Sequence, residues 1–75
     1  PVTHAVNVEF TLKTNSQVNL QLYDELGKLV KRIKKDNYSI GNNKIQLEMG
    51  NLKSGIYFVS LNVDDKVFTR QIVKK

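Results

Sequence analysis

The chain has 75 residues, of which 40% are hydrophobic, contains no cysteine and carries a formal net charge of +5 at pH 7. This length suffices for one small domain, and the lack of cysteine excludes a disulfide framework and a thiolate metal site. The basic residues are scattered and the aromatic ones are three tyrosines and three phenylalanines, so the composition favours an ordinary charged surface over a nucleic-acid-binding one.

The N-terminal part of the chain predicts two strands. The chain starts at Pro1 with neither Met nor a signal-peptide pattern, and we interpret it as a single domain, residues 1–75, cut from a longer secreted precursor. Apolar and polar residues alternate from Ala5 to Leu12 and again from Val18 to Tyr23, as in strands with one buried face. The turn-prone residues 13–17 between them predict an antiparallel hairpin. We also expect upstream residues to supply an edge partner for the first strand.

The segment from Tyr23 to Lys35 allows two interpretations. Its apolar residues lie at helical spacing with lysines between them, which would give a basic amphipathic helix suited to a membrane surface or an acidic groove. Gly27 argues against the helix, because glycine costs about 1 kcal/mol relative to alanine in a helix interior. The alternative is a turn followed by a strand from Lys28 to Lys34, with Leu29 and Ile33 on one face and Val30 on the other. We favour the strand, because the segments on either side also predict strands.

The rest of the chain predicts further strands. Residues 36–43 are rich in turn formers and predict the longest loop, and a strand follows from Lys44 to Met49. After Leu52, which we expect to plug one end of the core, apolar residues alternate from Tyr57 to Val63. Asp64–Asp65 then predict the tight turn of a terminal hairpin. About six or seven short strands at this spacing predict an all-β fold, a small antiparallel Ig-like β-sandwich.

No combination of residues predicts an active site. His4 is the only histidine, and no cysteine accompanies it to complete a metal set. The serines lack a partner base, and neither a Gly-x-Ser-x-Gly motif nor a glycine-rich phosphate loop is present. The carboxylate pairs at 24–25 and 64–65 are better explained by turns than by calcium binding. We therefore predict that the chain is not an enzyme, with no catalytic residue, cofactor or metal.

Four segments, in their order and spacing, carry a family resemblance that extends over essentially the whole chain. They are Val6–Leu12, Val18–Val30, Leu52–Leu61 and Thr69–Lys75. The most specific motifs are Tyr-Asp-x-x-Gly-Lys at 23–28, Leu-x-Ser-Gly-x-Tyr at 52–57 and the basic C-terminal end. Together they resemble the type A C-terminal sorting domain of the type IX secretion system. Residues 1–3 look like the tail of the family's Pro-Asn-Pro segment, and Asp64–Asp65 replace the glycine that the family usually carries in the last hairpin turn.

The resemblance implies a β-sandwich at the C-terminus of secreted hydrolases and adhesins of Gram-negative bacteria, and it favours the strand after Gly27. The implied partners are the outer-membrane secretion machinery, which recognises the folded module after its export through the periplasm, and a sortase-like surface peptidase, which removes it. The parent protein, N-terminal to the module, would then be attached to anionic lipopolysaccharide or released into the medium. Neither nucleic acid nor membrane insertion is implied.

The residues expected to carry the signal lie in the last third of the chain. Gly55 and Tyr57 match the family motif, although a turn glycine and a core aromatic would be equally good explanations. The terminal strand is the preferred candidate, because an exposed sheet edge can be recognised by strand addition. Its candidate residues are Thr69, Arg70, Ile72, Val73, Lys74 and Lys75. The last two would add electrostatic attraction to an acidic receptor.

Two other functions stay open on the sequence. A carbohydrate-binding or adhesion sandwich would need exposed aromatic side chains, and only Tyr23, Tyr38 and Phe68 are candidates. A structural Ig-like module of a surface assembly, such as a flagellar-hook-cap-type domain, would share the Tyr-Asp-x-x-Gly turn and the Gly-x-Tyr strand. It would not need a basic free C-terminus.

Overall fold

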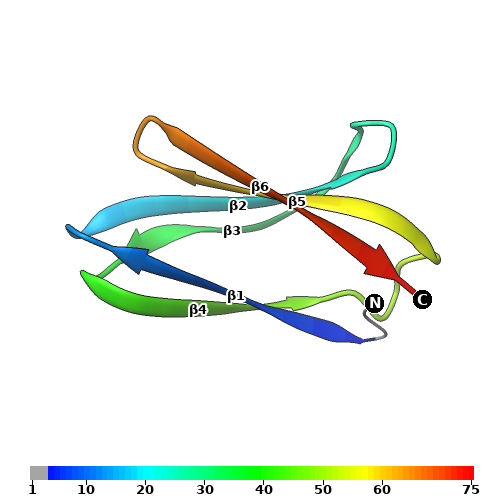
Figure 1. Ribbon diagram of the computed structural model, residues 1–75, viewed down its shortest axis with the longest axis horizontal. Coiled ribbons are helices and arrows are strands. Elements are labelled where there is room, and N and C mark those ends of the chain that lie inside the picture. Colours follow the sequence, from blue (N-terminus) through cyan, green and yellow to red (C-terminus); the bar gives the residue numbers. More distant parts are fainter. Residues whose placement is uncertain (1–3) are drawn as a thin grey trace.

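The computed structural model describes residues 4–75, and within this range the chain is built from strands alone (Figure 1). The strands are β1 Ala5–Leu12, β2 Ser16–Asp24, β3 Leu29–Tyr38, β4 Gly41–Glu48, β5 Gly55–Val63 and β6 Lys66–Lys74. β1 and β4 form a two-stranded antiparallel sheet, and a four-stranded antiparallel sheet has the order β3-β2-β5-β6. Packed together they confirm the predicted all-β sandwich. The assignment of residues 1–3 to a Pro-Asn-Pro tail lies outside the described residues.

The predicted hairpin between the first two strands is wrong. β1 pairs with β4, from Ala5 opposite Glu48 to Leu12 opposite Gly41, whereas β2 pairs with β3 and β5. The connection between β1 and β2 therefore crosses from one sheet to the other. Each strand has a single apolar stripe, and two such stripes can be buried face to face across a core as well as side by side, so alternation alone does not select the hairpin.

The segment after Gly27 is a strand, as favoured, and the alternative helix is wrong. β3 runs to Tyr38, so the predicted loop at residues 36–43 shrinks to the two residues between β3 and β4. The strand is longer than its apolar pattern indicates because residues 34–37 are polar and exposed on a sheet edge. Hydrogen bonding to β2, rather than burial, keeps these residues in the strand.

Two irregularities in β3 explain why its pattern was ambiguous. The register against β2 shifts twice: Leu20 pairs with Lys34 but Gln21 pairs with Arg32, and a second shift skips Val30. At a β-bulge two residues stand opposite one, which changes the phase of the inward and outward alternation. Val30 and Ile33 consequently both pack against the core, and the prediction that they lie on opposite faces is wrong. Their three-residue spacing resembles a helix for the same reason.

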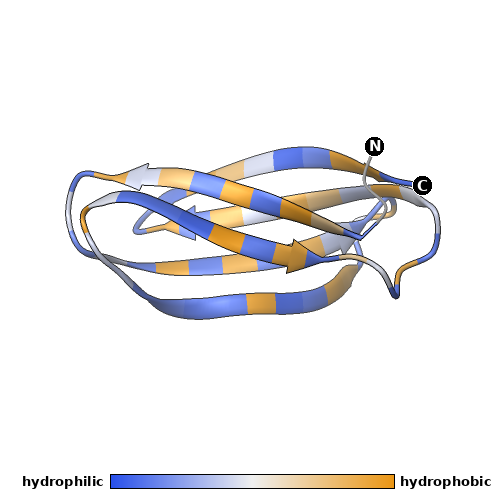
Figure 2. Ribbon diagram, turned by 90° about the horizontal axis from the view of Figure 1, so that it is seen from below, coloured by the Kyte–Doolittle hydropathy of each residue, from blue (hydrophilic) through white to orange (hydrophobic). Residues whose placement is uncertain are grey.

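The core lies between the two sheets and is supplied by the alternating apolar residues of both (Figure 2). Its fully buried side chains are Val18, Leu20, Leu22, Leu47 and Met49. Leu52 packs against the same cluster from one end, as predicted. In the part of the chain that is described, there is no helix long and apolar enough to span a membrane.

Candidate recognition surface

The terminal hairpin brings the predicted signal residues together. β6 pairs with β5 and forms one edge of the four-stranded sheet. In this register Gly55 lies opposite Lys74 and Tyr57 lies opposite Ile72, so the start of β5 and the end of β6 occupy one place in the fold. The Leu-x-Ser-Gly-x-Tyr motif and the terminal strand are therefore two parts of the same surface.

The motif at 52–57 fixes the start of β5. The Tyr57 ring is buried at 8% exposure, and its hydroxyl donates a hydrogen bond of 2.7 Å to the carbonyl oxygen of Lys53. Gly55, between them, has a φ of +156°, which a residue with a Cβ adopts only with strain. The phenol thus anchors the chain four residues upstream, as the tyrosine corner does in Ig-like domains. This closure also positions the end of β6, which pairs with the anchored segment.

The side chains of β6 alternate between the two faces of the sheet. Cross-strand partners share a face, so Thr69 and Val73, opposite Ser60 and Ile56, lie on the outer face. Lys66, Phe68, Arg70, Ile72 and Lys74 are, by the same reasoning, on the inner face.

The basic candidates at the C-terminus are placed differently. Lys74 is only 8% exposed, and its Nζ donates a 3.1 Å hydrogen bond to the carbonyl oxygen of Lys75. Arg70 and Lys75 are exposed. The charge available to an approaching surface therefore comes from Arg70 and Lys75 more than from Lys74.

The Tyr-Asp-x-x-Gly-Lys motif is explained by its turn. The Asp24 carboxylate accepts hydrogen bonds from the backbone N–H groups of Leu26 and Lys28, each at 2.9 Å. The backbone N–H of Gly27 donates to the Asp24 carbonyl, and Gly27 adopts a φ of +84°, which favours glycine. The motif therefore closes the connection between β2 and β3, with Leu26 exposed at its tip.

The last hairpin turn takes its shape without the usual glycine. Asp64, its first residue, has a φ of +54° and so occupies the left-handed region, which aspartate tolerates better than most residues. Val63 and Lys66 close the two-residue loop as a cross-strand pair. The turn keeps its place in the sequence and stores a small amount of backbone strain.

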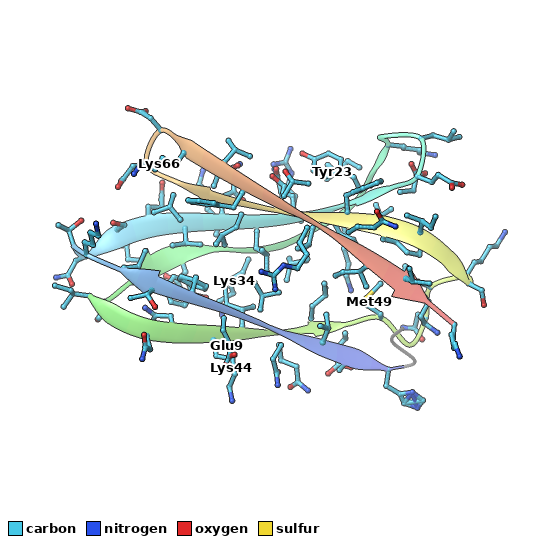
Figure 3. The ribbon with its side chains drawn as sticks, viewed as in Figure 1. Glu9, Tyr23, Lys34, Lys44, Met49 and Lys66 are labelled. Carbon is cyan, nitrogen blue, oxygen red and sulfur yellow. The ribbon has the colours of Figure 1, made fainter. Side chains whose placement is uncertain are left out.

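The structure offers little to the other functional hypotheses. Tyr38 packs edge-on against Phe10 with ring centroids 5.5 Å apart, whereas Tyr23 lies on the outer face of the larger sheet with its hydroxyl bonded to Gln21 (Figure 3). Phe68 lies on the inner face, so the three aromatic candidates do not make one flat platform for a sugar. Among residues 4–75, no three His, Cys, Asp or Glu side chains gather as a metal site would require.

A groove on one side of the sandwich was not predicted from the sequence. An open cavity of about 920 Å³ runs between β1 and the inner face of β5 and β6. Its lining includes Val8, Leu61, Phe68 and Arg70. The one available signal was the alternation Phe-x-Arg-x-Ile at 68–72, which puts a charged residue on the apolar face of a strand.

The whole chain matches one protein family model. The model is that of the secretion system C-terminal sorting domain, and the match covers residues 1–75. No curated protein and no solved structure shows a significant match to the chain.

Proposed function

The chain belongs to the family of secretion system C-terminal sorting domains, and from this we propose that it is a folded address label whose terminal strand β6 is recognised by the type IX machinery. As a type IX sorting signal, it marks the protein that carries it for export to the cell surface or the extracellular medium. The observation that carries the proposal is the family match over residues 1–75.

The proposed contact is the free edge of β6. Among residues 4–75 this strand is paired on one side only, so its other side presents backbone groups with which a receptor strand can pair. Thr69 and Val73 on the outer face would then give side-chain specificity. Arg70 and the exposed Lys75 would increase the association rate with an acidic receptor surface.

Gly55 and Tyr57 enter the proposal as positioning residues. Tyr57 is buried with its hydroxyl bonded to Lys53, and the exposed Gly55 has no side chain that a receptor could read. Their role would be to hold the end of β6 in place through the pairs Gly55–Lys74 and Tyr57–Ile72. A variant of either should therefore lose recognition together with local structure.

After translocation, we propose that a sortase-like surface peptidase removes the module and that the parent protein is attached to anionic lipopolysaccharide or released. The module itself would contribute no catalytic group to this step. Its parent protein would lie on its N-terminal side, where cleavage separates the two.

A secretion assay in a host with the type IX machinery tests the address function. A reporter with a signal peptide carries residues 1–75 at its C-terminus, either complete or truncated after Phe68. We expect the complete fusion in the medium or on the surface and the truncated one in the periplasm. If both fusions stay in the periplasm, the address function is refuted.

Two matched charge-reversal variants distinguish a specific role of the C-terminal end from a general effect of net charge on export. Lys75→Glu changes the exposed end of the chain, and Lys35→Glu makes the same change on β3, the opposite edge of the sheet. Both residues are exposed, so neither substitution should unfold the module. We expect slower export for the Lys75 variant alone; equal effects would rule out β6 as the contact.

A further inference from the structure

The smaller sheet covers only part of the larger one. Where β3 and β4 meet, which we call the closed side, Lys31 Nζ donates a 3.1 Å hydrogen bond to the Glu48 carbonyl oxygen and bridges the sheets. On the other side, which we call the open side, β1 and β6 are both edge strands within residues 4–75, and each runs along the length of the molecule (Figure 1). The groove lies between these two edges.

The apolar residues that face this groove are poorly buried. Phe68 is 56% exposed although it lies opposite Leu61 on the inner face of the larger sheet. Val6, Val8 and Phe10 of β1 are only half-buried, although they belong to the core-facing stripe of that strand. An additional strand beside β1 would cover these side chains, because the neighbouring strand of a sheet lies about 4.8 Å away.

Arg70 places a positive charge in the groove, on the inner face of β6. Arg70 lies opposite the buried Val59 on the inner face, and it is exposed. Within residues 4–75 it makes no hydrogen bond to a carboxylate. Three acidic residues also line the groove, and each has another place in the fold. Asp64 and Asp65 form the hairpin turn, and Glu9 lies opposite Lys44, with both side chains pointing away from the core (Figure 3).

We propose that the open side is a strand-acceptor site for a single extended segment of a partner protein, which pairs with the free edge of β1. The side chains that this segment turns toward the groove would be apolar over Phe68, Val8 and Leu61, and acidic opposite Arg70. Backbone hydrogen bonds give such a complex its affinity, and the alternate side chains give it specificity. The edge that is paired here is that of β1, whereas the proposed function uses the free edge of β6, and Arg70 is common to the two surfaces.

A single strand fits this site better than a second copy of the chain. The inner face of β6, with Phe68 and Arg70, extends beyond the β1 edge, because the larger sheet has four strands and the smaller one has two. A second sandwich that paired through its own β1 would bring its own projecting β6 into the same space. One slender peptide avoids this collision and still pairs along the eight residues of β1.

The test uses the purified chain and a fluorescent peptide, Thr-Val-Thr-Glu-Thr-Val-Thr-Val, whose length matches the eight residues of β1. Its valines and glutamate lie on one face of a strand. We expect saturable binding by fluorescence anisotropy and amide chemical-shift changes along β1. We also expect Arg70→Gln to weaken binding about tenfold, as for the loss of one charge-assisted hydrogen bond. Arg32→Gln, an exposed arginine on the far edge strand, is the matched control and should bind like the original chain.

Backbone methylation of the peptide tests strand pairing directly. Two peptides carry N-methyl groups on alternate residues, so that only one of them loses the N–H groups directed at β1. That peptide should bind at least about tenfold more weakly, and the other should bind like the parent. Thermal unfolding of each protein variant confirms that it is folded.

Three outcomes would overturn the proposal. The first is no binding at millimolar peptide, and the second is equal binding of the two methylated peptides. The third is that the amide chemical shifts of β1 change with protein concentration in the absence of peptide. The last would assign the edge to a second copy of the chain. Because no secretion step is involved, a negative result here leaves the export experiment unaffected.

Discussion

The closed and open sides of the sandwich differ in how deeply they bury two strands, β4 and β1, that have the same alternation of apolar and polar residues. Val6 and Leu47 are cross-strand partners on one face of the smaller sheet, as are Val8 and Ile45. On β4, Ile45 and Leu47 are 7% and 0% exposed, whereas Val6 and Val8 on β1 are only half-buried. The difference lies in what covers them, since β4 is bridged to β3 by Lys31 and β1 faces the groove. An alternating stripe thus identifies the face of a strand but not its degree of burial.

This contrast separates stability from recognition. The fully buried side chains lie on β2, on β4 and directly after β4, and none of them lines the groove. Burial away from the groove therefore carries most of the hydrophobic stabilisation. Burial of side chains on the open side stabilises the fold less. Its apolar residues can therefore exchange contact with water for contact with a partner strand. Burial also varies along the terminal hairpin on the open side: Ile72 near the end of β6 is buried, whereas Phe68 near its start is exposed.

The largest expected effect compares the two members of one cross-strand pair. Leu47→Ala should lower the free energy of unfolding by about 3 kcal/mol, because it leaves a cavity in the closed side. Val6→Ala, its partner on the open side, should cost about 1 kcal/mol or less, because the side chain is half in water. Urea denaturation measures both. Equal losses would show that the groove is filled by the protein itself.

A smaller effect should follow from the tyrosine anchor. Tyr57→Phe removes the hydrogen bond to the Lys53 carbonyl and should cost about 1–2 kcal/mol. Tyr23→Phe is the matched control, because its hydroxyl bonds to Gln21 on the outer face and should matter less. Urea midpoints give the comparison. If Tyr57→Phe costs no more than Tyr23→Phe, then the anchor is not what fixes β5.

The open end of the terminal hairpin should tolerate a stabilising change. Asp64→Gly places glycine where the backbone has a positive φ, and it should raise the stability by about 0.5–1 kcal/mol. Asp65→Gly is the control, since this neighbouring turn residue has no positive φ and should be neutral or slightly destabilising. Thermal unfolding at one protein concentration resolves the two. Stabilisation by both variants would point to the lost negative charge instead.

The smallest expected effect is a dependence on alkaline pH. Partial burial, together with the nearby Asp36 carboxylate, raises the pKa of Tyr38 above its ordinary value of about 10. The folded state therefore keeps the phenolic proton at a pH where the unfolded state releases it, and stability from this group is lost as the pH rises above about 10. Tyr38→Phe should show a shallower loss between about pH 9 and about pH 11. Urea titrations of the two proteins at each pH give the free energy of unfolding as a function of pH. The same slope for both proteins would show that the pKa of Tyr38 is not raised.

Local sequence features determined much of what was predicted. Period-2 alternation located four of the strands, and Asp64–Asp65 correctly placed the turn of the terminal hairpin. The motifs at 23–28 and 52–57 were recognisable because the hydrogen bonds that shape each one join residues close in sequence. The Asp24 carboxylate accepts from backbone N–H groups of its own turn, and the Tyr57 hydroxyl donates to the carbonyl of Lys53. The family and its export role followed from the same motifs.

Tertiary structure decided the rest, because pairing partners and coverage depend on residues far apart in the chain. Nothing local to residues 5–24 shows that β1 turns away from β2 to pair with β4. The two bulges of β3 arise from its register against β2, which places Val30 and Ile33 on the same face. Phe68 and Leu20 both lie on the inner face of the larger sheet, yet Phe68 borders an open groove and Leu20 is fully buried in the core. An apolar side chain is buried only where another layer covers it, and the number of strands in that layer is a property of the whole fold.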